Sequence, residues 1–207
     1  MNASDNQKPL EPGAILTAEF EYIAQSAFQA NEDRARVTSF YFVSVGSLVA
    51  AILGTQFAGV LSTPVYLAFA GLFLLLTALG ALTIAQLARL RVAWRDAALA
   101  MNQIKEYYIK QNGGLDDAFA WQTDTLPKAD KPYSIANLMA VEVALLGAIT
   151  FGVSVIFLLS SLGIPLTWGV LASVIFAIGC FVAFFTFYKH LLALHKDKSS
   201  TESEGAK

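Results

Sequence analysis

The chain has 207 residues, of which 56% are hydrophobic and 14% are charged, and its formal net charge at pH 7 is −2. A soluble domain usually has about a quarter charged residues, so this composition indicates a membrane protein. The slightly negative charge lacks the strongly basic character of nucleic-acid-binding proteins, and we expect no nucleic-acid partner.

Four long apolar segments follow one another along the chain, at residues 40–61, 65–87, 135–159 and 168–188. Each has roughly 20 residues or more, which at about 1.5 Å per helical residue is enough to cross a hydrocarbon layer of about 30 Å. The alternative is a set of buried helices in a soluble bundle, but four segments this long and almost uncharged are not typical of soluble cores. The sequence therefore predicts four transmembrane helices.

All 14 Lys and Arg residues lie on one side of the membrane that these segments imply. They precede the first span, separate the second from the third, or follow the fourth, whereas the connectors 62–64 and 160–167 carry no charge. Because basic loops stay in the cytoplasm, we expect both termini and the middle segment to be cytoplasmic. We assign the protein to the cytoplasmic (inner) membrane of a bacterium.

Two helices are expected to continue from the membrane into the cytoplasm. Apolar residues recur at three–four spacing before the first span and after the second, and no Pro or Gly interrupts either stretch. This spacing is typical of an a/d seam between packed helices. The seam residues are Leu16, Phe20, Ile23, Ala27, Ala30, Val37 and Tyr41 in the first stretch, and Leu87, Leu90, Trp94, Ala97, Met101, Ile104 and Tyr108 in the second.

The expected fold is all-α and polytopic, with four transmembrane helices in two hairpins. The short turn at 62–64 makes the first two helices antiparallel neighbours, so the first hairpin extends into a cytoplasmic antiparallel helical stalk. The predicted segments are a flexible N-terminus (1–15), a cytoplasmic helix continuous with the first span (16–39), spans at 40–61 and 65–87, a cytoplasmic helix (88–112), a cytoplasmic connector (113–134), spans at 135–159 and 168–188, and a cytoplasmic tail (189–207).

Opposite charges support the pairing of the two stalk helices. Residues 1–39 hold three basic and six acidic groups, whereas residues 88–112 hold five basic and two acidic ones. The pairs predicted by counting outward from the turn are Glu32 and Asp33 with Arg95, and Glu19 and Glu21 with Lys105 and Lys110. Each exposed pair contributes well under about 1 kcal/mol, so these pairs select the register more than they stabilise it.

The basic residues beside the second span suit other contacts equally well. Arg89, Arg91 and Arg95 could bind anionic lipid or a partner, with the two stretches lying on the lipid surface or solvated rather than paired. The paired stalk is favoured because the apolar seam and the charges agree independently.

Small residues recur every fourth position on three of the spans, which lets helix backbones approach closely in lipid. These stripes are Gly46, Ala50, Gly54 and Ala58 in the first span, Ala140, Ala144, Ala148 and Gly152 in the third, and Gly169, Ser173 and Ala177 in the fourth. Packing within one chain and association between subunits both use such stripes, and the sequence leaves both uses open.

Glu142 is an ionisable residue well inside a predicted span, roughly 10 Å from the cytoplasmic end of the third. A carboxylate there costs a few kcal/mol unless it is protonated, paired or hydrated. It lies on the opposite side of its helix from the small-residue stripe. Three interpretations remain open: a structural contact with Asn137, Gln86 or Arg89, the lining of an ion or solute path, and a proton-binding group in a transporter.

No motif for enzyme chemistry, a cofactor or a metal occurs in the chain. His190 and His195 are five residues apart, so their side chains diverge on a helix and do not suit a shared metal. We therefore expect a non-enzymatic, homo-oligomeric membrane protein that acts as a scaffold or regulated pore, with a stalk that binds a cytoplasmic protein partner or receives a signal. The alternatives are a small solute or proton-coupled transporter using Glu142, and a structural subunit of a larger membrane complex.

Overall fold

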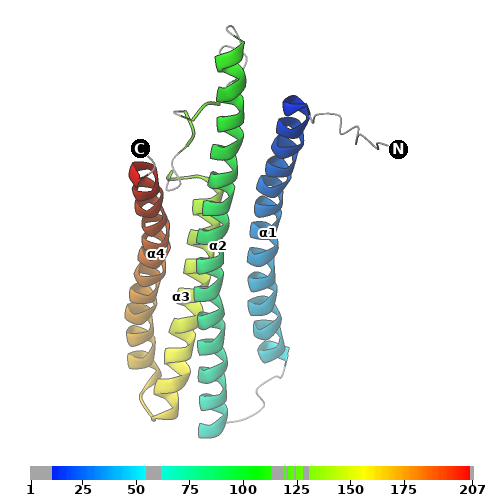
Figure 1. The fold of residues 1–207 in the computed structure, drawn as a ribbon. Helices are drawn as coiled ribbons and strands as arrows, with labels where there is room; N and C mark the ends of the chain where they lie inside the picture. Colours follow the sequence, from blue (N-terminus) through cyan, green and yellow to red (C-terminus); the bar gives the residue numbers. More distant parts are fainter. Residues whose placement is uncertain are drawn as a thin grey trace, which may run out of the picture. The chain divides into compact units, whose positions relative to one another are not determined.

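Helices are the only regular secondary structure in the part of the chain that the structure describes. The computed structural model describes residues 11–54, 62–112, 119, 121–123, 125–127 and 131–205, with side chains described as far as Leu194. Four helices in this part are long and apolar enough to cross a membrane, as predicted from the sequence, and this makes the chain a helical membrane protein. The helices are α1 (Pro12–Gly54), α2 (Thr63–Gln111), α3 (Ile135–Ser161) and α4 (Leu166–Gly205) (Figure 1).

The helix ends differ from the predicted segments at several points. Helix α1 begins at Pro12, inside the stretch expected to be flexible, because the fixed φ of proline suits the first helical turn. Helix α4 runs past residue 188 into the predicted tail. Parts of the expected N-terminus, connector and tail, and the end of the first predicted span, lie outside the described residues. These are residues 1–10, 55–61 with Ala58, 113–118, 120, 124, 128–130 and 206–207.

The described chain divides into two compact units. Unit 1 contains residues 12–31 of α1, residues 93–111 of α2 and the described part of the connector as far as residue 127. Unit 2 contains the remaining parts of α1 and α2 together with α3 and α4. The apolar segments predicted as spans therefore belong to unit 2.

Helices α3 and α4 of unit 2 are neighbours joined by a tight turn (Figure 1). Gly163 adopts a φ of +74°, a left-handed conformation that glycine reaches without strain, and it reverses the chain after the end of α3. Further along, a Cβ on Gly152 would lie 3.2 Å from Cβ of Ala177 and 3.3 Å from the carbonyl oxygen of Ser173. The small residues of α3 and α4 therefore meet at this point.

Polar contacts join α2 to α3 inside the apolar core. The hydroxyls of Thr77 and Thr150 are 3.0 Å apart, and the Ser154 hydroxyl donates a 2.7 Å hydrogen bond to the backbone oxygen of Ala70. All of these side chains are buried. Because a bilayer interior offers no water to a polar group, hydrogen bonds between helices satisfy these hydroxyls and hold α2 and α3 together.

Candidate functional site

The small-residue stripes of α1 and α3 have different surroundings. On α3, Ala140, Ala144, Ala148 and Gly152 are all buried. On α1, Gly46, Ala50 and Gly54 are exposed, and a Cβ built on either glycine would meet no atom within 4 Å. The α3 stripe therefore packs within the chain, whereas the described part of the α1 stripe remains open.

Glu142 lies on the outward side of α3, away from the buried stripe. Its side chain is exposed, and so are Leu138, Leu145 and Ile149, which share this face of the helix. The Glu142 carboxylate makes no hydrogen bond or ion pair with any other described residue, including the candidate partners Asn137, Gln86 and Arg89. An isolated carboxylate on an otherwise apolar helix face is the most unusual polar feature of the predicted spans.

An apolar cavity of about 440 Å³ lies between α1, α2 and α3 in unit 2. On α3 it is lined by Leu146, Ile149 and Val153, which continue the helix line that begins at Glu142 with three–four spacing. On α1 it is lined by Val45 and Val49, among others. The cavity thus follows the same flank of α3 on which the carboxylate lies.

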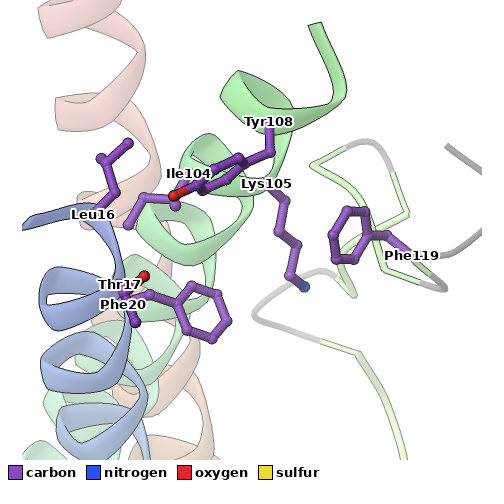
Figure 2. A pocket seen from close by; sticks show the side chains of 7 residues that line it. All are labelled: Leu16, Thr17, Phe20, Ile104, Lys105, Tyr108 and Phe119. Carbon is purple, nitrogen blue, oxygen red and sulfur yellow. The ribbon is translucent and has the colours of Figure 1, made fainter. Parts of the chain in front are cut away.

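A second pocket, of about 200 Å³, lies within unit 1. Figure 2 shows Leu16 and Phe20 of α1 facing the pocket from one helix, Ile104 and Tyr108 from α2, and Phe119 from the connector. Residues from the two predicted seams therefore line one apolar pocket. The described parts of α1 and α2 in this unit thus both contribute side chains to this pocket, and the paired stalk stays a prediction.

The charged residues of unit 1 do not pair as counting from the turn predicted. Lys105 donates to the side-chain oxygen of Asn102 at 3.2 Å and to the backbone oxygen of Trp121 at 3.5 Å. No ion pair joins the four described side chains Glu19, Glu21, Lys105 and Lys110. The connector folds against α2 and offers Lys105 a carbonyl, and an exposed ion pair is too weak to compete with this arrangement.

The remaining predicted pair involves residues of both units and stays a prediction. Asp33 forms a 3.5 Å ion pair with Arg36, one turn along α1. Glu32 is exposed, and Arg95 is half-buried. An ion pair at this spacing on a helix surface stabilises by only a few tenths of a kcal/mol.

The most buried line of α2 is displaced by about one residue from the predicted seam. Leu87 is buried as expected, but the predicted seam residues Met101 and Ile104 are only half-buried, whereas Ala98 and Asn102 are fully buried. Within unit 1, α2 contacts α1 on one side and the connector on the other. The spacing of apolar residues alone could not indicate the second of these contacts.

Two arginines are buried in unit 2, which the sequence did not predict. Arg34 of α1 and Arg91 of α2 are each only 6% exposed, whereas Arg89 is exposed. Burial, together with the nearby charge of Arg91, lowers the pKa of Arg34 from its ordinary value, although an arginine remains protonated. One signal for it lies in the sequence: Arg34 occupies the seam position between Ala30 and Val37.

Comparisons with protein-family models, with curated proteins and with solved structures find no match for this chain.

The packing of unit 1 can be tested by crosslinking. We expect cysteines introduced by Phe20→Cys and Ile104→Cys, in a Cys180→Ser background, to be joined within one chain by a short bismaleimide, because both positions line the same pocket. The product is measured as a mobility shift on a denaturing gel. The control replaces Phe20→Cys with Tyr22→Cys, a position 68% exposed on another side of α1. Equal crosslinking yields for the two pairs would contradict this packing.

Proposed function

We propose that this chain is a non-enzymatic, homo-oligomeric integral membrane protein that acts as a scaffold or regulated pore. In this proposal the subunits associate through their outward-facing transmembrane surfaces, and unit 1 is a cytoplasmic stalk that binds a protein partner. The distribution of basic residues supports a cytoplasmic location for both termini and for unit 1, in the inner membrane of a bacterium.

The exposed position of Glu142 carries the proposal. In a single chain within a bilayer, its carboxylate would face lipid roughly 10 Å from the interface, at a cost of a few kcal/mol. A second subunit that covers this face removes the carboxylate from lipid and can supply a hydrogen-bond partner or a shared water-filled space. Self-association therefore gives Glu142 an environment that the isolated chain lacks.

The open stripe on α1 supports self-association independently. Gly46 and Gly54 would let another helix approach closely, and the described neighbours within the chain do not use this face. The corresponding stripe on α3 is already covered by the chain itself. Association between copies would therefore use α1.

Exposed aromatic side chains on unit 1 support the binding of a partner there. Tyr22 is 68% exposed and Trp121 is 58% exposed, and Tyr107 is also exposed. Large aromatic residues provide much of the binding energy at protein interfaces, whereas most of a solvated surface has no need of them. A cytoplasmic protein with a complementary apolar surface is the proposed partner.

Self-association can be measured with two matched glycine substitutions. We expect Gly46→Leu to weaken association of the full-length protein about tenfold, because leucine blocks the close approach of a second helix. Gly179→Leu on α4 is the control, since a Cβ at either glycine meets no atom within 4 Å inside the chain. Mass by light scattering in mild detergent, over a range of protein-to-detergent ratios, gives the equilibrium. A monomer at every ratio, or equal effects of both leucines, would rule out the proposed interface.

Substitutions of Glu142 in the same purified protein distinguish the possible functions from one another. A regulated pore predicts that Glu142→Gln changes ion passage across proteoliposomes while the oligomer persists. A proton-coupled transporter predicts pH-driven solute flux that Glu142→Gln abolishes and Glu142→Asp only weakens. A scaffold predicts no flux, with loss of partner binding after Tyr22→Ala and Trp121→Ala on the exposed aromatic surface of unit 1. Wild-type protein that is monomeric and recovered only with other membrane proteins would identify a structural subunit of a larger complex.

A further inference from the structure

The pocket in unit 1 has mainly apolar walls and is large enough for a small molecule. Its volume is about 200 Å³, and its walls come from α1, α2 and the connector, through Leu16, Phe20, Ile104, Tyr108 and Phe119 (Figure 2). Close-packed protein interiors leave few voids larger than a water molecule, and an apolar cavity of about 150 Å³ can bind benzene. The unit 1 pocket therefore has room for one six-membered ring with a short substituent.

Lys105 is the charged side chain in the lining of this pocket. Figure 2 shows it running from α2 toward Phe119, whose ring centroid lies 5.8 Å from the Lys105 Nζ. The ammonium donates to the side-chain oxygen of Asn102 at 3.2 Å and to the backbone oxygen of Trp121 at 3.5 Å. Both acceptors are uncharged, and an ammonium has three N–H donors. Lys105 makes no ion pair with a carboxylate of the described residues, so its charge can attract an anion that enters the pocket.

The rest of the lining favours a ring with one negative charge. Phe20, Tyr108 and Phe119 offer aromatic surfaces, and rings pack well against other rings in edge-to-face and offset arrangements. The hydroxyl of Thr17, which also lines the pocket, already donates to the backbone oxygen of Gly13 at 2.9 Å and needs no partner from a ligand. A single ammonium balances one negative charge, which suits a carboxylate better than a phosphate with nearly two.

We propose that the unit 1 pocket binds a small aromatic carboxylate, whose ring lies against Phe20, Tyr108 and Phe119 and whose carboxylate accepts a hydrogen bond from Lys105. Hydrogen bonds between charged groups are about twice as strong as those between neutral groups. Such a ligand contacts two helices and the connector, so its binding stabilises unit 1 in the described arrangement. The site lies within one chain and goes beyond the proposed association, because it requires neither a second subunit nor a protein partner.

Calorimetric titration of the full-length protein in a neutral detergent tests this site, with protein-free micelles as the blank. Phenylacetate is the probe, phenylacetamide has nearly the same shape without the charge, and acetate has the charge without the ring. We expect saturable binding of phenylacetate that is about tenfold or more tighter than the binding of either other compound. Lys105→Gln should weaken the binding of phenylacetate about tenfold and leave the binding of phenylacetamide unchanged.

Lys110→Gln is the matched control, because it removes the same charge from an exposed position on the same helix. Wild-type protein that does not bind phenylacetate saturably overturns the proposal. Equal affinities for phenylacetate and phenylacetamide, or equal weakening by Lys105→Gln and Lys110→Gln, overturn it as well. If Lys105→Gln disturbs the connector, Phe20→Trp decides: the larger ring fills part of the pocket and should weaken phenylacetate binding about tenfold or more. Unchanged affinity in Phe20→Trp would show that the compound binds elsewhere.

Discussion

Gly147→Ala is expected to lower the free energy of unfolding by about 1–3 kcal/mol, the usual cost of overpacking a core. A Cβ at this position would lie 2.5 Å from Cε2 and 3.1 Å from Cδ2 of Phe184, across the contact between α3 and α4. The ring also packs against the main hydrophobic cluster and lies beside Gly80 of α2, where its Cε2 is 3.3 Å from the position that a Cβ would take, so it has little room to move. The close approach of three helices therefore depends on glycine at position 147.

Unfolding of the full-length protein in mixed micelles, with increasing denaturing detergent, measures this effect. Gly179→Ala is the control, because its Cβ meets no atom within 4 Å and alanine is the better helix former. The double substitution Gly147→Ala with Phe184→Leu should recover part of the lost stability, since a smaller side chain relieves the clash. Equal stability of Gly147→Ala and Gly179→Ala would show that the ring moves aside without cost.

Tyr41→Ala is expected to destabilise unit 2 by about 3 kcal/mol, as found when large aromatic residues are truncated in well-packed cores. Tyr41 is 1% exposed and belongs to the main hydrophobic cluster. The end of its ring packs against Gly80 of α2, where a built Cβ would lie 2.7 Å from the phenolic oxygen. Removal of the ring would leave a cavity among α1, α2 and α4 that surrounding side chains could fill only in part.

Tyr41→Phe separates the ring from its hydroxyl. The hydroxyl is buried beside Thr150 of α3 but makes no hydrogen bond of full geometry with a described residue, so its loss should leave stability almost unchanged. The same detergent unfolding measurement applies. A loss of more than about 1 kcal/mol in Tyr41→Phe would indicate that the hydroxyl makes a stabilising hydrogen bond after all.

The sequence predicted helix type and helix faces well where one pattern dominated. On α1, the expected seam residues Ala27, Ala30 and Tyr41 are buried, because a single repeating contact controls that face of the helix. On α2 the same reasoning missed the most buried positions by about one residue. Residues of α1 and of the connector both lie against α2. Which α2 residues are most buried therefore depends on where the connector folds, and the sequence pattern does not show this.

For the site residues as well, the sequence predicted some features and only the tertiary structure determined others. Apolar length and the one-sided distribution of basic residues predict four spans and their orientation, because crossing lipid requires internally hydrogen-bonded, uncharged helices wherever the rest of the chain lies. Only the tertiary structure decided which stripe of small residues the chain itself covers, that Glu142 faces outward, and that Arg34 and Arg91 are buried together. Each of these depends on how one helix is rotated against its neighbours, and periodicity gives the faces of a helix without giving the element that each face meets.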